Sequence, residues 1–262
     1  MIWGWRIFFK DQLPHGRGSV GRGSAGRALA ISCALALLGT PLVAGSVIGQ
    51  VELKDSNIAS VRKGRDFSGV VVWLLAANGT PTPADGKHAR LIQKDKTFTP
   101  HVLAIETGTT VDFPNYDPIF HNAFSNFSGQ LFDIGLYAPG TIKSFRFQRP
   151  GVVRIFCNIH PAMSAVILVV DTPYFTVSGR DGKFEIASVT PGEYRLKVFH
   201  ERASESVLQG LERKVAVGAE NLTLPTMEIS ETGYLPASHK NKYGKDYSNT
   251  PEDGLTYPGA AK

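Results

Sequence analysis

Seven residues, from Cys157 to Met163, constrain this chain more than any other stretch. They read Cys-Asn-Ile-His-Pro-Ala-Met and space a thiol, an imidazole and a thioether three residues apart. Residues 152–156 before them and 164–170 after them are rich in β-branched and apolar side chains. Runs of this composition predict strands. The stretch is therefore expected to be a tight turn between two strands, with its three side chains at one end of a sheet.

A second imidazole lies upstream, at His121 in the segment Asn-Tyr-Asp-Pro-Ile-Phe-His-Asn. Two histidines and one cysteine with a weak axial methionine are the ligand set that suits a blue-copper electron-transfer centre. The candidate ligands are therefore His121, Cys157, His160 and Met163. The alternative for Cys157 is an ordinary buried core cysteine. The short spacing to His160 and Met163, in a chain with only three methionines, favours the metal.

The positive charge of the chain lies mainly in its first 45 residues. The whole chain has 262 residues, 28 basic and 23 acidic, for a net charge of +5. Residues 1–45 hold five of the basic residues and one of the acidic ones, which leaves 23 against 22 in the rest. Binding to a nucleic-acid backbone needs a clustered positive surface, so nucleic acid is not an expected partner.

The same 45 residues have the pattern of an export signal. A Gly-rich segment with three arginines precedes the apolar run 28–38, and the small residues Ala44 and Gly45 follow. This order is typical of a secretory signal peptide, which predicts cleavage after Gly45, or else after Ala44, and a periplasmic location. The apolar run is short for a membrane span. The alternative is a retained N-terminal anchor, the one case in which we expect the protein at a membrane.

Cleavage would leave one cysteine. Cys33 lies inside the apolar run and would be removed with the signal, so Cys157 would have no partner for an intramolecular disulfide. A lone thiol in an oxidising compartment is exposed to damage unless it is buried or bound to a metal. A lone cysteine in an exported protein therefore also favours a metal at Cys157.

The remaining pattern predicts an all-β protein. Short apolar runs alternate with Gly- and Pro-rich turns, which is typical of a β-sandwich. Residues 67–77 are continuously apolar, as expected of a strand buried on both faces. A period of two places Val153, Ile155 and Cys157 on one face, so the thiol should point into the core. The long segment 122–140 carries four aromatic residues and is expected to be ordered over the site: Phe124, Phe127, Phe132 and Tyr137.

Residues 67–170 resemble the cupredoxins, specifically the amicyanin and plastocyanin-like group of the bacterial methylamine-utilisation proteins. The spacing Cys-x-x-His-x-x-Met, with a proline after the histidine, is similar to the short ligand loop of amicyanin. Residues 108–115, Gly-Thr-Thr-Val-Asp-Phe-Pro-Asn, resemble the family's Gly-x-x-Val-x-Phe-x-Asn strand. The connection between His121 and the cysteine strand is longer than in the family and richer in aromatics.

This resemblance implies a Greek-key cupredoxin β-sandwich over residues 46–170 with one type 1 copper ion. It implies three strong ligands and a weak axial one: His121, Cys157 and His160, and Met163. Asn122 matches the residue that in the family ties the two ligand loops together near the sulfur. An electron would enter or leave through the surface around His160, Pro161 and Ala162. The implied partner is a redox protein such as a c-type cytochrome or a periplasmic dehydrogenase.

The C-terminal part predicts a second, smaller sandwich at residues 171–230. Residues 175–177 are expected to pair with 184–186 across the Asp181–Gly182 turn. The pattern Asp-Gly-Lys-Phe-Glu-Ile followed by Pro-Gly-Glu-Tyr-Arg-Leu resembles the carboxypeptidase-regulatory-like or transthyretin-like β-module, which implies no catalysis. The alternative is that these strands extend the cupredoxin sheet.

Residues 231–262 lack periodicity and are rich in Pro, Gly, Lys and Asn, which predicts a flexible tail that is either disordered or loosely docked. His239 within it is expected to be solvated, with weak metal scavenging as the alternative. Elsewhere, His88 and His101 lie on either side of a turn, and an ordinary pairing is favoured over a metal site.

The sequence thus predicts an exported carrier of single electrons and no enzyme. Phosphate-binding glycine loops and Ser-His-Asp arrangements do not occur. A copper-delivery protein with the metal as cargo is the main alternative, although a thiolate embedded in a strand favours a fixed redox centre. A structural adhesion module is the third interpretation, which the complete ligand set disfavours.

Overall fold

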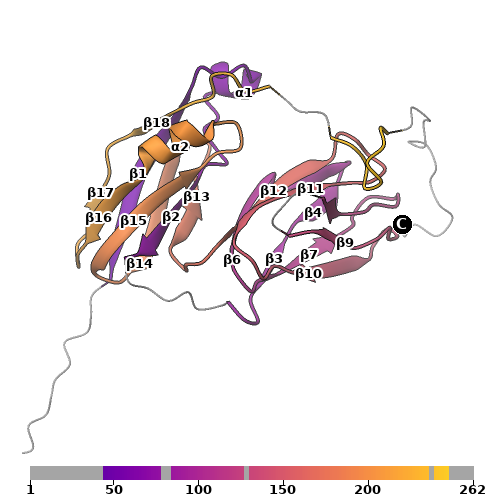
Figure 1. Cartoon of the computed structure of the whole chain (residues 1–262), viewed down its shortest axis with the longest axis horizontal. Helices are drawn as coiled ribbons and strands as arrows, with labels where there is room; N and C mark the ends of the chain where they lie inside the picture. Colours follow the sequence, from indigo (N-terminus) through magenta and orange to yellow (C-terminus); the bar gives the residue numbers. More distant parts are fainter. Residues whose placement is uncertain (1–43, 78–83, 127–129, 236–238, 248–262) are drawn as a thin grey trace, which may run out of the picture. The chain divides into compact units, whose positions relative to one another are not determined.

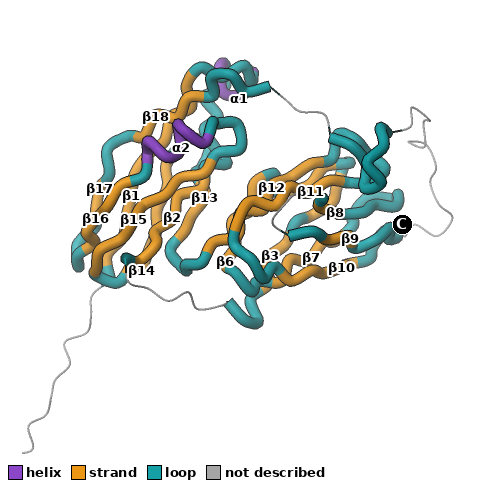
Figure 2. Tube along the Cα trace, in the orientation of Figure 1, coloured by secondary structure: helices purple, strands orange, loops and turns teal. Residues whose placement is uncertain are grey.

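A computed structural model of the protein describes residues 44–77, 84–126, 130–235 and 239–247 (Figure 1). Over these ranges the chain is mostly β, with strands β1 to β18 and two short helices joined by loops (Figure 2). Neither helix is long and apolar enough to cross a bilayer. The predicted export signal lies outside the described residues up to position 43.

Strands from both ends of the described chain form one sandwich, here called the outer sandwich. One sheet has the order β14–β1–β17, with β18 also pairing with β1, and the other has the order β13–β2–β15–β16. Its core contains Val47, Val51, Leu74 and Leu196, each 0% exposed. The elements are β1 (Gly45–Lys54), α1 (Ala59–Arg62), β2 (Val71–Ala76), β13 (Phe175–Val177), β14 (Lys183–Val189), β15 (Gly192–Phe199), α2 (Glu205–Leu211), β16 (Arg213–Val217), β17 (Leu222–Thr223) and β18 (Met227–Ser230).

The pairing of β1 and β2 corrects the predicted domain boundary. The sequence predicts one domain over residues 46–170 and another over 171–230. In the structure, β1 pairs with β14, β17 and β18, and β2 pairs with β13 and β15. The physical reason is that β1, through its alternate residues Val47, Val51 and Leu53, and the apolar β2 supply side chains to a core that they share with the strands after residue 170.

Strands β3 to β12, which lie between β2 and β13 in the sequence, form a second sandwich, here called the inserted sandwich. Its sheets have the orders β10–β7–β3 and β6–β12–β11–β8–β9, with β4 and β5 as a separate hairpin. Val111 and Phe113 from one sheet face Val153 and Ile155 from the other, all 2% exposed or less. The elements are β3 (His88–Arg90), β4 (Ile92–Lys94), β5 (Thr97–Thr99), β6 (Val102–Glu106), β7 (Thr110–Pro114), β8 (Phe124–Ser125), β9 (Phe132–Asp133), β10 (Ile142–Arg146), β11 (Gly151–Phe156) and β12 (Ser164–Val170).

Thr107 contacts the residues at both ends of the inserted sandwich in the chain, Ala84 and Asp171. Its carbonyl accepts from the Ala84 N–H at 2.8 Å, and its own N–H donates to the Val170 carbonyl at 2.9 Å. Its hydroxyl donates to Asp171 Oδ1 at 2.5 Å. The far end of β12 is Ser164, about 20 Å away at the usual rise per strand residue. Ala84 and Asp171, on either side of the inserted sandwich in the chain, therefore lie near the end of β12 opposite the Cys157–Met163 turn.

Strand β2 is buried on both faces, as its continuous apolar run predicts. Val72 and Leu74 belong to the core of the outer sandwich. Val71 and Trp73 belong to a further apolar cluster, together with Leu168 of β12. An apolar residue is therefore required at each of these successive positions, which explains why the run shows no alternation.

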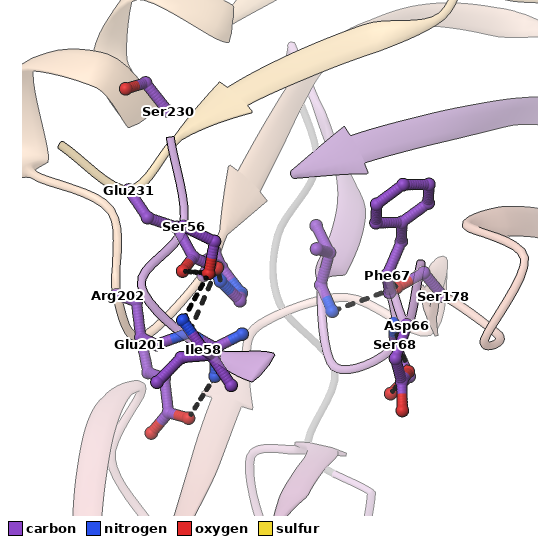
Figure 3. A network of polar contacts seen from close by, with 12 residues as sticks. Ser56, Ile58, Asp66, Phe67, Ser68, Ser178, Glu201, Arg202, Ser230 and Glu231 are labelled. Atoms are coloured by element: carbon purple, nitrogen blue, oxygen red, sulfur yellow. Dashed lines mark hydrogen bonds and ion pairs between the residues drawn. The ribbon is translucent and has the colours of Figure 1, made fainter. Parts of the chain in front are cut away.

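A buried polar network centres on Glu231, which directly follows β18 and is 2% exposed (Figure 3). Glu231 accepts from Ser56 Oγ at 2.5 Å, from Arg202 Nε at 3.0 Å and from His200 Nε2 at 2.8 Å. Ser56 Oγ in turn accepts from the Ile58 N–H ahead of α1 at 3.1 Å. Burial alone would raise the pKa of Glu231, but these hydrogen bonds and the Arg202 charge outweigh it and lower the pKa to about 2.

The expected pairing of residues 175–177 with 184–186 is wrong. Strand β13 pairs with β2, whereas β14 pairs with β1 in the other sheet. The turn itself exists, with the Gly182 N–H donating to the Gly179 carbonyl at 2.9 Å. It joins two sheets instead of two neighbouring strands, because both β-runs find more apolar partners in β1 and β2.

The C-terminal tail is docked where the structure describes it, at residues 231–235 and 239–247. Glu231 is buried, and residues 239–247 contact the Cys157–Met163 turn. His239 is partly buried against Phe156, with ring centroids 3.9 Å apart, and is therefore not fully solvated. The composition of the segment is polar, but its aromatic and lysine side chains find specific partners on the inserted sandwich.

Candidate metal centre

Two loops carry the candidate ligands. Cys157 directly follows β11, and the turn before β12 is closed by main-chain bonds from Cys157 to Met163 (3.2 Å) and from Met163 to His160 (3.1 Å). His121 lies after β7 and exchanges two main-chain bonds with Tyr137, at 3.2 and 2.9 Å. Each loop is thus fixed by its own backbone before any metal is considered.

Three ligand atoms of these loops converge. The Cys157 Sγ lies 3.6 Å from His160 Nδ1 and 3.9 Å from His121 Nδ1, and the two Nδ1 atoms are 3.1 Å apart. Imidazole and thiolate ligands lie about 2.0–2.3 Å from a metal ion, so at angles of roughly 100–130° they are separated by about 3.1–4.0 Å. The observed distances fit one metal ion bound by all three atoms.

The cluster is dry. His121 and Cys157 are 0% exposed and His160 is 7% exposed. Met163 is 0% exposed and belongs to the same core cluster as Cys157. One thiol, two imidazoles and a nearby thioether form a soft donor set, which selects copper over hard cations. The residues present therefore fit a copper ion.

Asp117 orients the first imidazole. Its Oδ2 lies 2.7 Å from His121 Nε2, and its carboxylate also accepts from the N–H groups of Asp95 and Lys96 at 2.6 and 2.9 Å. With the ring proton on Nε2 held by Asp117, the Nδ1 lone pair faces the cluster, as in the carboxylate–histidine–metal arrangement. Burial lowers the pKa of His121 although Asp117 opposes that shift, so the neutral, metal-binding form is favoured.

The cysteine environment depends on Asn122. Burial raises the pKa of the Cys157 thiol, while the main-chain N–H groups of Ile159, Asn122 and His160 act in the opposite direction. The Asn122 side chain donates to Asp133 Oδ1 at 2.7 Å. Asn122 thus influences the thiol from the His121 loop, and its role between the two ligand loops stays a prediction. A metal would replace the thiol proton, since the thiolate is the binding form.

The expected electron-transfer surface is only partly exposed. Pro161 and Ala162 are exposed, but His160 between the turn and the core is 7% exposed. The aromatic segment is ordered where it is described: Phe124 and Phe132 are buried, and Phe132 stacks on Phe145 with centroids 4.5 Å apart. Phe127 lies outside the described residues.

Three contributors to the site were not predicted from the sequence. Asp117 stands four residues before His121, and that spacing is the one signal that would have identified it. Tyr137 was expected only as a packing aromatic, yet its backbone holds His121 and its hydroxyl donates to the Phe113 carbonyl at 3.0 Å. The segment 239–247 gives no sequence signal of its contact with the ligand turn.

The two other histidines considered as ligands lie apart from this cluster. His88 Nδ1 is 3.0 Å from Asp112 Oδ2, and His101 Nε2 is 2.8 Å from Glu201 Oε1. Among the described residues, the one group of three or more metal-binding side chains is His121, Cys157 and His160. The ordinary pairing favoured for His88 and His101 thus takes the form of two separate carboxylate contacts.

Comparison with known proteins gives partial likenesses to solved structures. No family model matches the chain, and no curated protein matches it. A purple cupredoxin from Nitrosopumilus maritimus is 26% identical over 31% of this chain and 99% of its own, with a TM-score of 0.29. Amicyanin from Paracoccus versutus is 20% identical over 39% of this chain and 98% of its own, with a TM-score of 0.30.

A Cu-containing nitrite reductase from Thermus scotoductus is 26% identical, with a TM-score of 0.31. That match covers 38% of this chain and 25% of the reductase, so this chain spans about a quarter of that protein. All three scores are low, and none of these matches covers more than 39% of this chain. The assignment of copper therefore depends on the ligand atoms themselves.

Proposed function

We propose that the protein is an exported mononuclear type 1 copper protein that carries single electrons between redox partners. One observation carries this proposal: Cys157 Sγ, His121 Nδ1 and His160 Nδ1 all lie within 4.8 Å of one another in a buried cluster. His121, Cys157 and His160 would hold a copper ion, with Met163 as a weak fourth ligand, and such a donor set suits both copper oxidation states.

The protein would hold these ligands in a fixed arrangement. A bound copper ion would supply the one-electron Cu(II)/Cu(I) couple. Asp117 and Tyr137 hold His121, and the main-chain bonds within the Cys157–Met163 turn hold the other ligands. Ligands that are fixed before and after the electron moves need little rearrangement, which favours fast transfer. Burial of the cluster excludes water and added ligands, so substrate turnover is not expected.

The alternative is copper delivery, with the metal as cargo. A delivery site has to release its ion to a partner, which requires exposed ligands. Here His160 is the most exposed of the three ligands at 7%. The burial of all three favours a resident redox ion over cargo.

Location and partners follow from the sequence and belong to the proposal. The signal-like residues 1–45 support export to the periplasm. A c-type cytochrome or a periplasmic dehydrogenase would then be the electron donor or acceptor, with Pro161 and Ala162 as exposed contact residues. Association with a membrane is proposed only for a form that retains residues 1–45.

Visible absorption of the copper-loaded protein tests the function. An intense thiolate-to-copper band is expected, and Cys157→Ser should abolish it. Met163→Leu should keep the band and change the reduction potential, because the axial bond is long and weak. His160→Asn should lose the band, whereas the matched control His88→Asn removes a histidine far from the cluster and should keep it. A colourless copper complex in the wild type would contradict the proposal.

A further inference from the structure

Residues 239–247, here called the C-terminal strap, contact the outer side of the ligand turn. The Tyr247 hydroxyl donates to the carbonyl of Cys157 at 2.8 Å. His239 Nε2 donates to the carbonyl of Pro161 at 2.8 Å. The strap thereby binds the main chain of the short turn at two positions, and this turn carries two of the three cluster ligands.

Lys242 in the middle of the strap connects the two ligand loops. Its main-chain N–H donates to Asn158 Oδ1 at 2.9 Å, on the turn after Cys157. Its Nζ lies 2.7 Å from Asp133 Oδ2, while Asp133 Oδ1 accepts from Asn122. Asn122 is the neighbour of His121 in the chain, so this contact reaches the His121 loop. One residue of the strap therefore constrains both loops at once.

Aromatic packing supports this arrangement. The His239 ring stacks on Phe156 with centroids 3.9 Å apart and planes 24° apart. Tyr247 meets the edge of His239 at 5.3 Å and 85°. Phe156, at the end of β11, directly precedes Cys157. The strap therefore contacts the Phe156 side chain as well as the Cys157 carbonyl. Contacts of these kinds exclude water from the surface they cover.

We propose that the C-terminal strap is a built-in clamp on the candidate metal centre, with Tyr247 and Lys242 as positioning residues. It holds the Cys157 turn against the His121 loop and limits access to the Cys157 sulfur from outside. The clamp's effect on copper rests on the function proposed above. The contacts of the strap with the Cys157 turn do not depend on that function, so the clamp and the copper function can be tested separately.

The reactivity of the Cys157 thiol in metal-free protein tests the clamp. The full-length chain is used with Cys33→Ser, so that Cys157 is the only thiol, and an aromatic disulfide reagent reports the rate of opening of the turn. Tyr247→Phe removes one hydrogen bond and should raise the rate about fivefold. Lys242→Ala should raise it by a similar factor, and a chain ending at residue 235 should raise it at least about tenfold.

Two matched controls separate the clamp from general destabilisation. Tyr234→Phe removes a hydroxyl from the same C-terminal region outside the strap, and Lys245→Ala removes an exposed lysine from within it. Both should react at the wild-type rate. If the chain ending at residue 235 keeps wild-type thiol reactivity, the strap does not cover Cys157 and the proposal is wrong. Equal effects of Tyr247→Phe and Tyr234→Phe would also overturn it.

A spectroscopic measurement completes the test. In copper-loaded protein, Tyr247→Phe should shift the thiolate-to-copper band, because the Cys157 carbonyl loses its hydrogen bond and the sulfur shifts with it, whereas Tyr234→Phe should leave the band in place. Faster thiol reaction in a protein that binds no copper would retain the clamp and reject the copper function. A blue protein whose strap variants change neither the thiol rate nor the band would retain the function and reject the clamp.

Discussion

Replacing Glu231 with glutamine should destabilise the outer sandwich in a way that depends on pH. Glu231 is 2% exposed and accepts from Ser56, His200 and Arg202. Glutamine has nearly the same shape as the protonated acid and lacks the charge. The difference in the free energy of unfolding between wild type and Glu231→Gln therefore reports how strongly the folded protein favours the carboxylate.

The magnitude follows from the pKa, which falls from 4.5 to about 2 on folding. A difference of this size corresponds to about 3 kcal/mol of stability for the ionised form. Because the folded pKa is lowered, this stabilisation is fully present above about pH 5 and is lost as the pH falls toward 2. Less than half of it remains at about pH 3.

Urea unfolding of both proteins at pH 7, 5, 4 and 3 measures this difference. We expect about 3 kcal/mol at pH 7 and pH 5, with a decline below that. Glu228→Gln, three residues earlier, is the control: Glu228 is 66% exposed and pairs with Lys54, and such surface pairs contribute roughly 0–1 kcal/mol. A pH-independent difference, or one no larger than that of Glu228→Gln, would refute the reasoning.

Two further predictions follow from the structure. Asp117→Asn should weaken copper binding about 10- to 100-fold in a chelator competition while keeping the thiolate band, because His121 loses its orienting carboxylate; Asp112→Asn, which removes the same kind of partner from His88, should not. A fragment of residues 84–171 should fold and bind copper, whereas a fragment of residues 46–171 should expose β1 and β2 without their partners and aggregate, as size-exclusion chromatography and amide NMR dispersion would show.

Sequence patterns predicted the inserted sandwich well because its signals are local. A period of two placed Val153, Ile155 and Cys157 in the core, and all three are buried. The predicted strand at residues 164–170 corresponds to β12 residue for residue. The spacing of Cys157 and His160 within one turn leaves them few ways to lie far apart.

Long-range pairing is what the sequence does not show. The apolar run of β2 is compatible with either sandwich, and only competition among partners decides that it pairs with β13 and β15. Asp117 and the strap raise the same difficulty, since a carboxylate or a lysine in a polar segment looks solvated until its partner is known. In each case the deciding contact joins residues that periodicity does not relate.

The position of the insertion gives the strap its significance. Ala84 and Asp171, on either side of the inserted sandwich in the chain, both contact Thr107, and the ligand turn lies at the other end of β12. A domain whose two ends are close together can be inserted into another fold, because it replaces only a short loop of the surrounding domain. The outer sandwich would therefore have little influence on the ligands through these connections. The strap follows β18 in the chain and contacts the ligand turn directly, so the last part of the described chain completes the clamp around a cysteine that is synthesised much earlier.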